Sequence, residues 1–401
     1  MKVLFLSDDF PPISFGGAGI STYELALGMK KAGHEVFVIT TCRKKSDMGQ
    51  SDYNGLKIFK ITSDYHERWR AWVSLYNPPV VRKVEALLKK IQPDVVHANN
   101  IHYYLSYYCL KIAKKYAKTV VWTARDAMAF SYGKLTTKRY LSTLDTRLSW
   151  RDNIKQAGKR YNPLRNFFIK KYIKYANKRF AVSEALKTAL AQNDIENVTV
   201  AHTGIDQDSW QIDAEMIFAF RKKFGLENKK IILFGGRLGA GAQVVYAMKL
   251  LAPKAPDAVL VIMGTEESAE RMKSERGNLN AVFTGWLSGK EKVAAYHASY
   301  VVWVPSTYFD AFPRSALEAS ASGKPVIATM FGGASELVQD GETGYVINPL
   351  RPQKIADKTL DLLKNSQKAE QFGRAGYERV QKEFNFKQYV RAYLVAYGQS
   401  H

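Results

Sequence analysis

The chain has 401 residues, a length typical of about two domains of ~150–200 residues each. Its 59 Lys and Arg residues exceed its 37 Asp and Glu residues, and the net charge of +22 favours anionic partners such as nucleic acid, anionic lipid or phosphorylated ligands. The two cysteines, Cys42 and Cys109, have neither metal-ligand nor redox spacing, and no apolar run approaches the ~20 residues of a membrane-spanning helix. These features argue against a disulfide scaffold, a cysteine metal site and a membrane-spanning protein.

In the first half of the chain, short apolar runs alternate with stretches of helical periodicity. The first apolar run begins at residue 2 and leaves no room for a signal peptide, so we expect a cytoplasmic protein. Ser183 is placed to cap the helix that follows it. Strands are predicted over 2–7, 35–40, 94–98, 118–123 and 178–183, and helices over 20–31 and 80–91. This alternation predicts a parallel sheet with helices on both faces.

The second half repeats the same plan after a polar, turn-rich segment at 204–213. Strands are predicted over 229–236, 258–263, 280–285, 300–305, 325–329 and 344–348, and the segment 352–401 is predicted to be helical throughout. We therefore predict an α/β fold of two doubly wound, Rossmann-like domains, 1–206 and 207–384. We expect the final helix, 385–401, to pack back on the first domain.

Two glycine-rich loops follow predicted strand ends, where open parallel sheets bind their ligands. Gly16 and Gly17 precede a helix, so their backbone can approach the oxygens of a phosphate; a tight turn without a ligand is the alternative. This first loop has neither a G-x-G-x-x-G pattern nor the Lys-Ser/Thr of a phosphate loop. In the second loop, Arg237 leaves a strand end among glycines, and its guanidinium suits a diphosphate, although a surface arginine has the same pattern.

The stretch STYFDAFPRSALEASASGKP, residues 306–325, places two carboxylates beside a break in secondary structure. Pro313 suits a first helical turn, and Gly323 suits the end of that helix. Asp310 then lies in the loop before the helix, and Glu318 lies in its second turn. A helix N-terminus attracts phosphate and carboxylates accept hydrogen bonds from vicinal hydroxyls, so the stretch predicts a ligand with both phosphate and sugar. The alternative is a cap and a buried acid paired with an arginine, which explains Asp310 better than Glu318.

Together these residues resemble the retaining, nucleotide-sugar-dependent glycosyltransferases with the GT-B fold, a group that includes phosphatidylinositol mannosyltransferases, lipopolysaccharide core glucosyltransferases and sucrose synthases. The resemblance covers nearly the whole chain, from GGAGISTYELALGMKKAGHEVFVIT and DVVHANN through VSEAL, TGID and GGRL. It is most specific at VPSTYFDAFPRSALEASASGKPVIATMFGGASELVQDGETGYVINP, because many positions agree there at fixed spacing. The resemblance implies two Rossmann-like domains that face each other across a cleft.

The resemblance also implies roles for individual residues. Arg237 would bind the donor diphosphate, Glu318 the ribose hydroxyls, and Asp310, where the family usually has Glu, the hydroxyls of the donor sugar. Further donor contacts would come from Gly16, Gly17, Trp286 near the base, Ala311 and Phe312. The co-substrate would be a UDP- or GDP-sugar, without a metal or another cofactor, because Arg and helix N-termini can neutralise the leaving diphosphate. The acceptor would be a glycan or a lipid-linked molecule, and the sugar would keep its anomeric configuration.

Two positions depart from the family pattern in the predicted catalytic region. The family usually has a Lys five residues after the Arg of GRL, and Ala242 stands there. Its His-Asp pair after the fifth strand is replaced by Arg125 and Asp126, and Arg cannot act as a base near neutral pH. We hypothesise that Arg125 partly replaces the missing cation and acts in catalysis with Asp310 and Arg237.

Two histidines straddle the end of the strand predicted at 94–98. His97 is within this strand and His102 lies just beyond it, and Asp126 follows the next strand. We expect these three residues near the acceptor or the cleft, although spacing alone does not single out either histidine as catalytic.

The segment 134–180 is rich in basic residues with interleaved aromatic residues. It holds 14 Lys and Arg residues, which only Asp145 and Asp152 oppose. The pattern favours helices on an anionic membrane surface, where each basic residue contributes ~1 kcal/mol, and hence a peripheral enzyme at the inner membrane face. A solvated helical insert with core aromatics is the alternative. We do not expect nucleic-acid binding, because no RNA-binding signature accompanies the basic run.

Two other functions remain open for the same architecture. Because of Ala242 and Arg125, the protein could be a catalytically impaired GT-B protein that binds sugar nucleotides or glycans without efficient transfer. A nucleotide-sugar epimerase would need its own acid–base pair in the cleft, and the sequence offers no convincing one.

Overall fold

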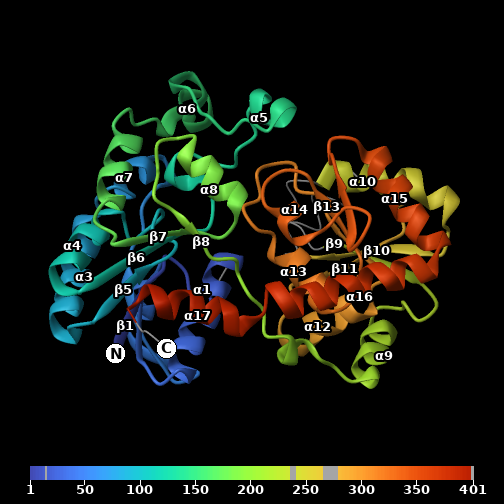
Figure 1. The fold of residues 1–401 in the computed structure, drawn as a ribbon, viewed down its shortest axis with the longest axis horizontal. Coiled ribbons are helices and arrows are strands. Elements are labelled where there is room, and N and C mark those ends of the chain that lie inside the picture. Colours follow the sequence, from blue (N-terminus) through green and yellow to red (C-terminus); the bar gives the residue numbers. More distant parts are fainter. Residues whose placement is uncertain (14–15, 235–240, 265–278, 399–401) are drawn as a thin grey trace. The chain divides into compact units, whose positions relative to one another are not determined.

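The computed structural model describes residues 1–13, 16–234, 241–264 and 279–398. It divides into two compact units, each built on its own sheet (Figure 1). Unit 1 comprises Met1–Thr203 and the C-terminal segment from Tyr389, and unit 2 comprises Gly204–Gln388. The division therefore lies at Thr203, slightly before the position at 206 that the turn-rich segment predicts.

The sheet of unit 1 has eight strands in the order β3-β4-β2-β1-β5-β6-β7-β8, and all its pairs are parallel except β3 with β4. The strands are β1 (Lys2–Leu6), β2 (Glu35–Cys42), β3 (Gly49–Tyr53), β4 (Leu56–Thr62), β5 (Val95–Ala98), β6 (Thr119–Ala124), β7 (Lys178–Ala181) and β8 (Thr199–Val200). Val3 of β1 lies opposite Val36 on one side and Val95 on the other. From Val3 to Leu6 this central strand is fully buried, as expected of an apolar strand covered on both faces.

The helices of unit 1 connect these strands. They are α1 (Gly17–Lys31), α2 (Arg70–Val73), α3 (Pro78–Ile91), α4 (Tyr108–Tyr116), α5 (Lys138–Thr143), α6 (Trp150–Ala157), α7 (Arg165–Ile173), α8 (Glu184–Ala191) and α17 (Phe386–Ala396). The predicted cap of α8 is confirmed, because the Ser183 hydroxyl accepts a hydrogen bond from the N–H of Leu186 at 3.0 Å. Helix α1 begins at Gly17, earlier than the predicted residue 20, since Gly16 has the extended conformation of an N-cap residue.

The C-terminal segment contributes to the core of unit 1, and Figure 1 shows α17 beside α1 and the strands of this unit. Tyr397 lies with its hydroxyl 2.6 Å from His97 Nδ1. Thr123 donates a hydrogen bond of 3.3 Å to the hydroxyl of Tyr393, whose ring centroid lies 5.0 Å from that of Phe180. Tyrosines from the end of the chain thus pack on residues of β5, β6 and β7.

The sheet of unit 2 has six strands in the order β11-β10-β9-β12-β13-β14, and all its pairs are parallel. The strands are β9 (Lys230–Phe234), β10 (Ala258–Met263), β11 (Ala281–Gly285), β12 (Val301–Val304), β13 (Val326–Thr329) and β14 (Gly344–Ile347). Trp303 of β12 is fully buried in the core of this unit, where its indole N–H donates to Thr359 at 2.8 Å. The two parallel sheets confirm the predicted α/β class with two Rossmann-like domains.

The helices of unit 2 are α9 (Ala214–Lys223), α10 (Gly241–Leu251), α12 (Gly289–Ala298), α13 (Arg314–Ala321), α14 (Ala334–Leu337), α15 (Pro352–Lys364) and α16 (Ser366–Glu383). The segment 352–401, predicted to be helical throughout, forms three helices with short breaks between them over its described residues. Asn365 ends α15 and caps α16, since its side chain accepts a hydrogen bond from the N–H of Lys368 at 3.0 Å. Asn385 likewise accepts from the N–H of Gln388 at the start of α17.

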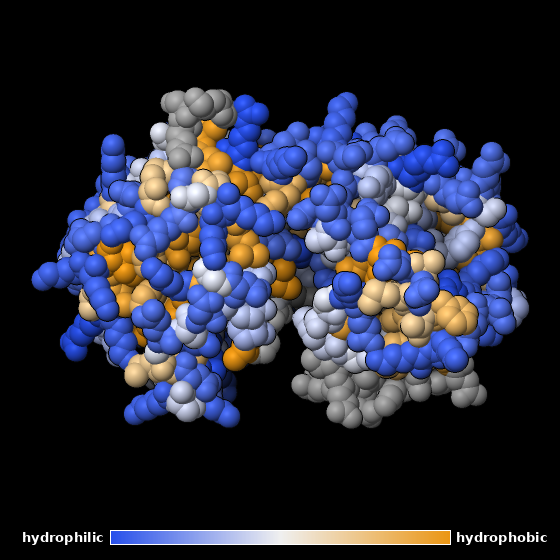
Figure 2. Space-filling view, turned by 90° about the horizontal axis from the view of Figure 1, so that it is seen from below, coloured by the Kyte–Doolittle hydropathy of each residue, from blue (hydrophilic) through white to orange (hydrophobic). Residues whose placement is uncertain are grey.

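The described part of the chain contains no helix with the length and apolar character that a bilayer span requires. Figure 2 shows one face of the molecule, where hydrophilic residues predominate and smaller hydrophobic areas lie on both units.

Candidate functional site

The acidic loop of unit 2 lies between β12 and α13, as predicted. Pro313 is the N-cap residue of α13, and Gly323, at a φ of 66°, follows the C-cap Ser322. Asp310 lies in the loop and Glu318 in the helix. The local prediction succeeded here because Pro fixes φ at the start of the helix and Gly tolerates the positive φ at its end.

Glu318 is buried, with 2% of its surface exposed, and contacts three polar side chains. Lys292 and Arg314 donate to its Oε1 at 2.6 and 2.8 Å, and Tyr296 donates to its Oε2 at 2.9 Å. Burial raises the pKa of this carboxyl group, but the two cations outweigh burial, and the pKa lies below its usual value. The buried acid paired with an arginine, which sequence analysis considered for Asp310, therefore occurs at Glu318.

The loop that carries Asp310 is fixed by the segment at 331–333. Asp310 donates its N–H to the carbonyl of Phe331 at 3.2 Å and accepts from the N–H of Gly333 at 2.9 Å. Between them, Gly332 has a φ of 94°, and a Cβ atom there would lie 1.9 Å from the carbonyl oxygen of Asp310. Only glycine fits this approach, and sequence analysis did not single out Gly332.

The side chain of Asp310 accepts a hydrogen bond from the Ser306 hydroxyl at 3.1 Å and is half-buried. Ala311 and Phe312 are buried, and the Phe312 ring lies 5.7 Å from the ring of Phe384. The loop therefore has a fixed backbone and a carboxylate near its surface.

Three further donor-site predictions concern other parts of unit 2. Trp286 follows β11 with 63% of its surface exposed, directly after Gly285 at a φ of 74°. Ala242 is exposed in the first turn of α10. Arg237 lies outside the described residues, so its predicted contact with a diphosphate remains a prediction.

In unit 1, Gly16 and Gly17 form the start of α1, where no side chain of the described residues caps the helix.

Asp8, at the end of β1, is a structural residue that sequence analysis did not identify. Its carboxylate accepts hydrogen bonds from three successive backbone N–H groups, those of residues 103–105, at 2.7, 2.8 and 2.7 Å. Burial raises the pKa of Asp8 to about 7, although these three donors favour its ionised form. Asp8 thereby fixes the loop after β5.

Arg125 holds several elements of unit 1 together. Its Nε donates to Asn99 at 2.9 Å, Nη2 donates to the Tyr389 hydroxyl at 2.7 Å, and Nη1 donates to Thr203 at 3.4 Å. Thr203 and Tyr389 are the residues of unit 1 that adjoin unit 2 in the chain. In this arrangement all three guanidinium nitrogens bind protein groups.

His97 differs from the expectation of a residue exposed to a ligand. It has no exposed surface, and its Nε2 lies 2.8 Å from the Thr123 hydroxyl while its Nδ1 contacts Tyr397. Burial, with a smaller effect of Arg125, lowers its pKa well below the usual value. The His97 ring is therefore a neutral core group of unit 1.

His102 and Asp126 lie together beyond β5 and β6. His102 Nε2 is 3.5 Å from the carboxylate of Asp126, whose side chain is 43% exposed. Burial lowers the pKa of His102 to about 4, against the opposing effect of Asp126, so the ring is neutral near pH 7. Asp126 also accepts from the N–H of Met128 at 2.9 Å. The structure brings His102 and Asp126 together, because parallel strands end at one edge of the sheet; their predicted place near the acceptor stays a prediction.

A cavity of about 270 Å³ lies in unit 1 beside the basic segment. Its lining includes Trp150, Tyr161, Asn153, Asn162, Asn166 and Gln192. Trp150 is 64% exposed, and the Oδ1 atom of Asn153 is buried without a hydrogen-bond partner among the described residues. Aromatic faces and amide groups therefore line this cavity.

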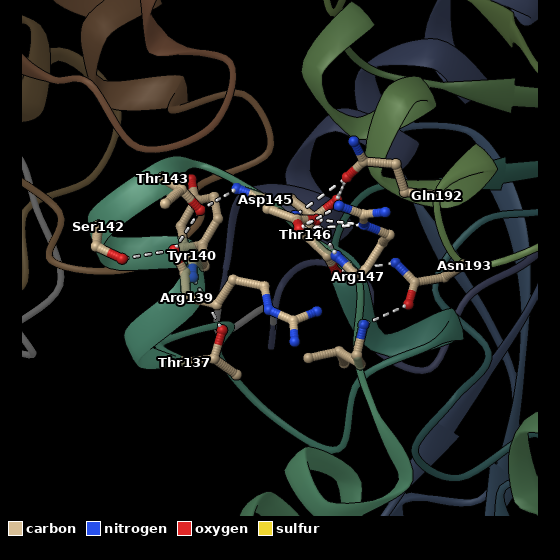
Figure 3. Close-up of polar contacts among 11 residues, drawn as sticks. Thr137, Arg139, Tyr140, Ser142, Thr143, Asp145, Thr146, Arg147, Gln192 and Asn193 are labelled. Carbon is tan, nitrogen blue, oxygen red and sulfur yellow. Dashed lines mark hydrogen bonds and ion pairs between the residues drawn. The ribbon is translucent and has the colours of Figure 1, made fainter.

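The loop between α5 and α6 is held on the end of α8, as Figure 3 shows. Gln192 accepts hydrogen bonds from both the N–H and the hydroxyl of Thr146. Asn193 accepts from the N–H of Leu148 at 3.1 Å and donates to the carbonyl of Thr146 at 3.0 Å. These contacts fix the start of α6, where Trp150 lines the cavity.

The predicted residues therefore form separate groups. In unit 1, Arg125, Asp126 and His102 follow β5 and β6, and His97 lies beneath them in the core. In unit 2, Asp310 lies in the loop before α13, Glu318 lies in α13, and Trp286 follows β11. The described residues contain no cluster of three or more His, Cys, Asp or Glu side chains that could hold a metal ion.

Two family models match the chain one after the other. "Glycosyltransferase Family 4" matches residues 15–209, and "Glycosyl transferases group 1" matches residues 216–379. Among relatives of similar length, the glycogen synthase of Mycobacterium tuberculosis strain H37Rv is 24% identical over 420 residues, which cover 99% of this chain and 94% of the relative.

Solved structures share the fold. Sucrose-phosphate synthase from Thermosynechococcus elongatus matches with a TM-score of 0.79 at 20% identity, over 99% of this chain and 98% of that one. Anabaena HepE, solved in complex with UDP and glucose, matches with a TM-score of 0.73 at 18% identity, over 98% of both chains.

The two parallel-sheet units and these likenesses define a protein of the GT-B fold. The chain belongs to the group 1 glycosyltransferases, as the residues at 304–349 predict, and it is accordingly a sugar-transferring enzyme.

Proposed function

We propose that the protein transfers a hexosyl group from a nucleoside-diphosphate sugar to a glycan or lipid-linked acceptor, with retention and without a metal. The observation that carries the proposal is the carboxylate pair of unit 2, with Asp310 on a fixed loop and Glu318 in the helix that follows. The complex of Anabaena HepE with UDP and glucose supports UDP as the nucleotide.

In this proposal the residues of unit 2 bind the donor. Glu318 would accept hydrogen bonds from the ribose hydroxyls in place of the Tyr296 hydroxyl or beside it, and Lys292 would keep the carboxylate ionised. Asp310 would contact the sugar hydroxyls with the backbone of Ala311 and Phe312, and Trp286 would lie near the base. Arg237 and the start of α1 at Gly16 and Gly17 would contact the diphosphate.

The proposed transfer exchanges one bond for another at the anomeric carbon. The bond from this carbon to the leaving diphosphate oxygen breaks, and a bond to the acceptor oxygen forms on the same face of the sugar. The acceptor proton passes to the leaving diphosphate, so no side chain is required as a base. The missing cation at Ala242 would weaken charge stabilisation of the leaving group, on the order of 10²-fold in rate.

The acceptor is proposed to bind unit 1. The cavity beside α6 supports a glycan, because amides such as those of Asn153 and Gln192 can bond vicinal hydroxyls while aromatic faces contact sugar C–H groups. His102 and Asp126 are the proposed acceptor residues near the strand ends, and His97 supports them only from the core.

We further propose that unit 1 binds an anionic membrane surface at the inner face. The aromatic residues of the basic segment fall into two classes, since Tyr140 is buried while Trp150 and Phe167 are 64% and 63% exposed. Trp69 and Trp72, both 50% exposed, add to the exposed aromatic surface. Exposed aromatic residues among Lys and Arg are the composition of a membrane-interface segment.

A second candidate is a protein that binds sugar nucleotides or glycans without efficient transfer. The observation that favours it is the engagement of Arg125, whose three guanidinium nitrogens bind Asn99, Thr203 and Tyr389. In this state Arg125 is not available to replace the missing cation at Ala242.

Incubation with UDP- and GDP-sugars, with release of the nucleoside diphosphate followed by a coupled assay, tests both candidates. Slow hydrolysis or transfer supports the enzyme, and Ala242→Lys should then increase the rate. Tight binding of UDP without turnover, in both the wild type and Ala242→Lys, would favour the impaired protein. Unchanged donor affinity in Arg125→Ala would refute the hypothesis that this arginine replaces the cation.

A further inference from the structure

The cavity beside α6 runs from the core of unit 1 to its surface. Phe130 and Tyr132, from the loop after β6, are buried, whereas Trp150, at the start of α6, is 64% exposed. The start of α7 and the residues after α8 complete the lining. The volume of about 270 Å³ is close to the roughly 300 Å³ of small ligand sites, which is room for one sugar ring and too little for a nucleotide sugar.

The described residues that line this cavity carry no net charge. Lys170 and Asp194 are the charged members of the lining, and the Lys170 ammonium donates to the Asp194 carboxylate at 2.7 Å. In a chain with a net charge of +22, this balance is a local exception. An anionic ligand would have to compete with Asp194 for the cation, so the cavity favours an uncharged ligand.

Two amide side chains of the lining retain hydrogen-bonding capacity. Within the described residues no hydrogen bond holds the side chain of Asn153, and its Oδ1 atom is buried without a partner. Because an unpartnered buried acceptor is costly, rotation of this amide toward a hydroxyl in the cavity would be favourable. Gln192 accepts from Thr146 through its oxygen, and its amide nitrogen has no partner in the described part of the chain. Such amides suit hydroxyl groups, which both donate and accept.

The other amides of the lining hold the wall of the cavity in place. Asn162 donates to the carbonyl of Ala71 at 3.2 Å and accepts from the N–H of Leu164 at 3.0 Å. Asn166 donates to the carbonyl of Phe130 at 2.9 Å. A ligand would therefore enter a preformed site, where binding requires little ordering of the chain.

Trp150 supplies an aromatic face on a fixed backbone. The Ser149 hydroxyl accepts from the N–H of Asp152 at 3.2 Å, and the Asp152 carboxylate accepts from the N–H of Ser149 at 2.9 Å, so the first turn of α6 is capped at both positions. The half-buried ring of Tyr161 also lines the cavity. Aromatic faces that pack on C–H groups, beside uncharged amides that bond hydroxyls, match the two kinds of surface on a pyranose ring.

We propose that the cavity beside α6 binds one uncharged pyranose ring of an oligosaccharide acceptor. This assignment rests on the proposed function and narrows it to an acceptor of two or more uncharged sugars. His102 and Asp126, the proposed acceptor residues at the strand ends, are not among the residues that line the cavity. The ring held in the cavity is therefore a different unit from the one that receives the transferred sugar.

The test measures the binding of trisaccharides to the full chain by saturation-transfer NMR and calorimetric titration. Maltotriose, cellotriose and tri-N-acetylchitotriose are the neutral probes, and trigalacturonic acid is a charged probe of the same length. The site variants are Trp150→Ala and Asn153→Leu. The matched control is Trp69→Ala, because Trp69 is 50% exposed in the same unit and does not line the cavity.

We expect at least one neutral trisaccharide to bind the wild type and Trp69→Ala with the same Kd. Trp150→Ala and Asn153→Leu should each raise this Kd roughly tenfold, through loss of the aromatic face and of a hydroxyl partner. With a UDP-sugar as donor, both variants should raise the KM of that acceptor more than they lower kcat, because the cavity contacts a sugar away from the reacting bond. Trp150 is largely exposed, so its variant keeps the test valid if Asn153→Leu does not fold.

The proposal is refuted if no neutral trisaccharide binds, if the site variants bind as Trp69→Ala does, or if trigalacturonic acid binds more tightly than the neutral probes. The rise in Tm with UDP gives a separate measure of the donor function. Stabilisation by UDP without trisaccharide binding would reject the sugar site and leave the proposed donor site intact. Trisaccharide binding without stabilisation by UDP would retain the sugar site and reject the proposed donor binding.

Discussion

The substitution Glu318→Gln tests the buried charge cluster of unit 2 most directly. It removes the negative charge that Lys292 and Arg314 share and keeps an oxygen that can accept from Tyr296. The side chains of the two cations are only 25% and 13% exposed, so the substitution removes a negative charge from beside both of them in a partly dry environment. Removal of one partner from a buried pair costs roughly 3–5 kcal/mol, and the residual exposure of Lys292 reduces this to about 2–4 kcal/mol.

This cost predicts a decrease in Tm of about 5–12 °C for a unit of this size. The assay is thermal and urea unfolding followed by tryptophan fluorescence, since Trp303 is buried in this unit. The matched control is Glu291→Gln on α12, which neutralises an exposed carboxylate paired with Lys223 and should cost less than ~1 kcal/mol. Equal Tm values for the two variants would refute the reasoning.

The same cluster predicts a pH dependence. The pKa of Glu318 is lower in the folded chain than its ordinary value of 4.5, because the attraction of Lys292 and Arg314 for the ionised form outweighs the effect of burial. Its contribution to the free energy of unfolding is therefore complete above about pH 4.5 and is lost as the pH falls through the folded pKa. The stability difference between the wild type and Glu318→Gln should shrink on acidification in this range. A difference that stays constant down to pH 3 would contradict the assignment.

Three further predictions concern other features. Gly332→Ala would place a Cβ 1.9 Å from the Asp310 carbonyl oxygen, so we expect sugar-nucleotide turnover to fall roughly tenfold or more. The control is Gly341→Ala, at a φ of 78° in open space, which should lower the free energy of unfolding by only ~1 kcal/mol through backbone strain. Turnover equal in the two alanine variants would disprove a role for the close approach. His97 has a depressed folded pKa, so it should cost the wild type stability as the pH falls below about 6.5, by up to ~1.4 kcal/mol per pH unit. Urea unfolding of His97→Gln should show a slope smaller by this amount, while the buried His102 keeps its own contribution. Phe167→Ser should weaken the sedimentation of the protein with vesicles of anionic lipid. The control is Phe218→Ser, because Phe218 is 60% exposed in unit 2, and it should leave sedimentation unchanged. Equal losses in the two variants would argue against the membrane surface of unit 1.

Local sequence signals predicted the features that depend on a few neighbouring residues. Ser183 and the Pro313–Gly323 helix are examples, because caps and helix ends are fixed by residues next to them. The β3–β4 hairpin could have been found in the same way. Its turn, Asn54–Gly55, has both residues at positive φ, the pattern that Asn-Gly favours between antiparallel strands, and sequence analysis did not use it.

Features that depend on distant parts of the chain were not predictable in this way. The partners of Arg125 come from residues 99, 203 and 389, and the contact of Asp310 with 331–333 joins two loops. The ion pair of Glu318 with Lys292 also depends on how α12 packs against α13. Sequence spacing carries no information on such contacts, because the tertiary packing decides which charges meet.

The return of the chain to unit 1 has a consequence for how the protein is made. Tyr393 and Tyr397, which fill part of the unit 1 core, follow the whole of unit 2 in the chain, so they leave the ribosome after it. The first unit therefore cannot complete its core until unit 2 has been synthesised, although its own sheet is finished long before. An expression fragment that ends at Thr203 would leave the buried ring of His97 without its tyrosine partner, so a stable isolated unit 1 would need the C-terminal helix supplied by fusion or as a peptide.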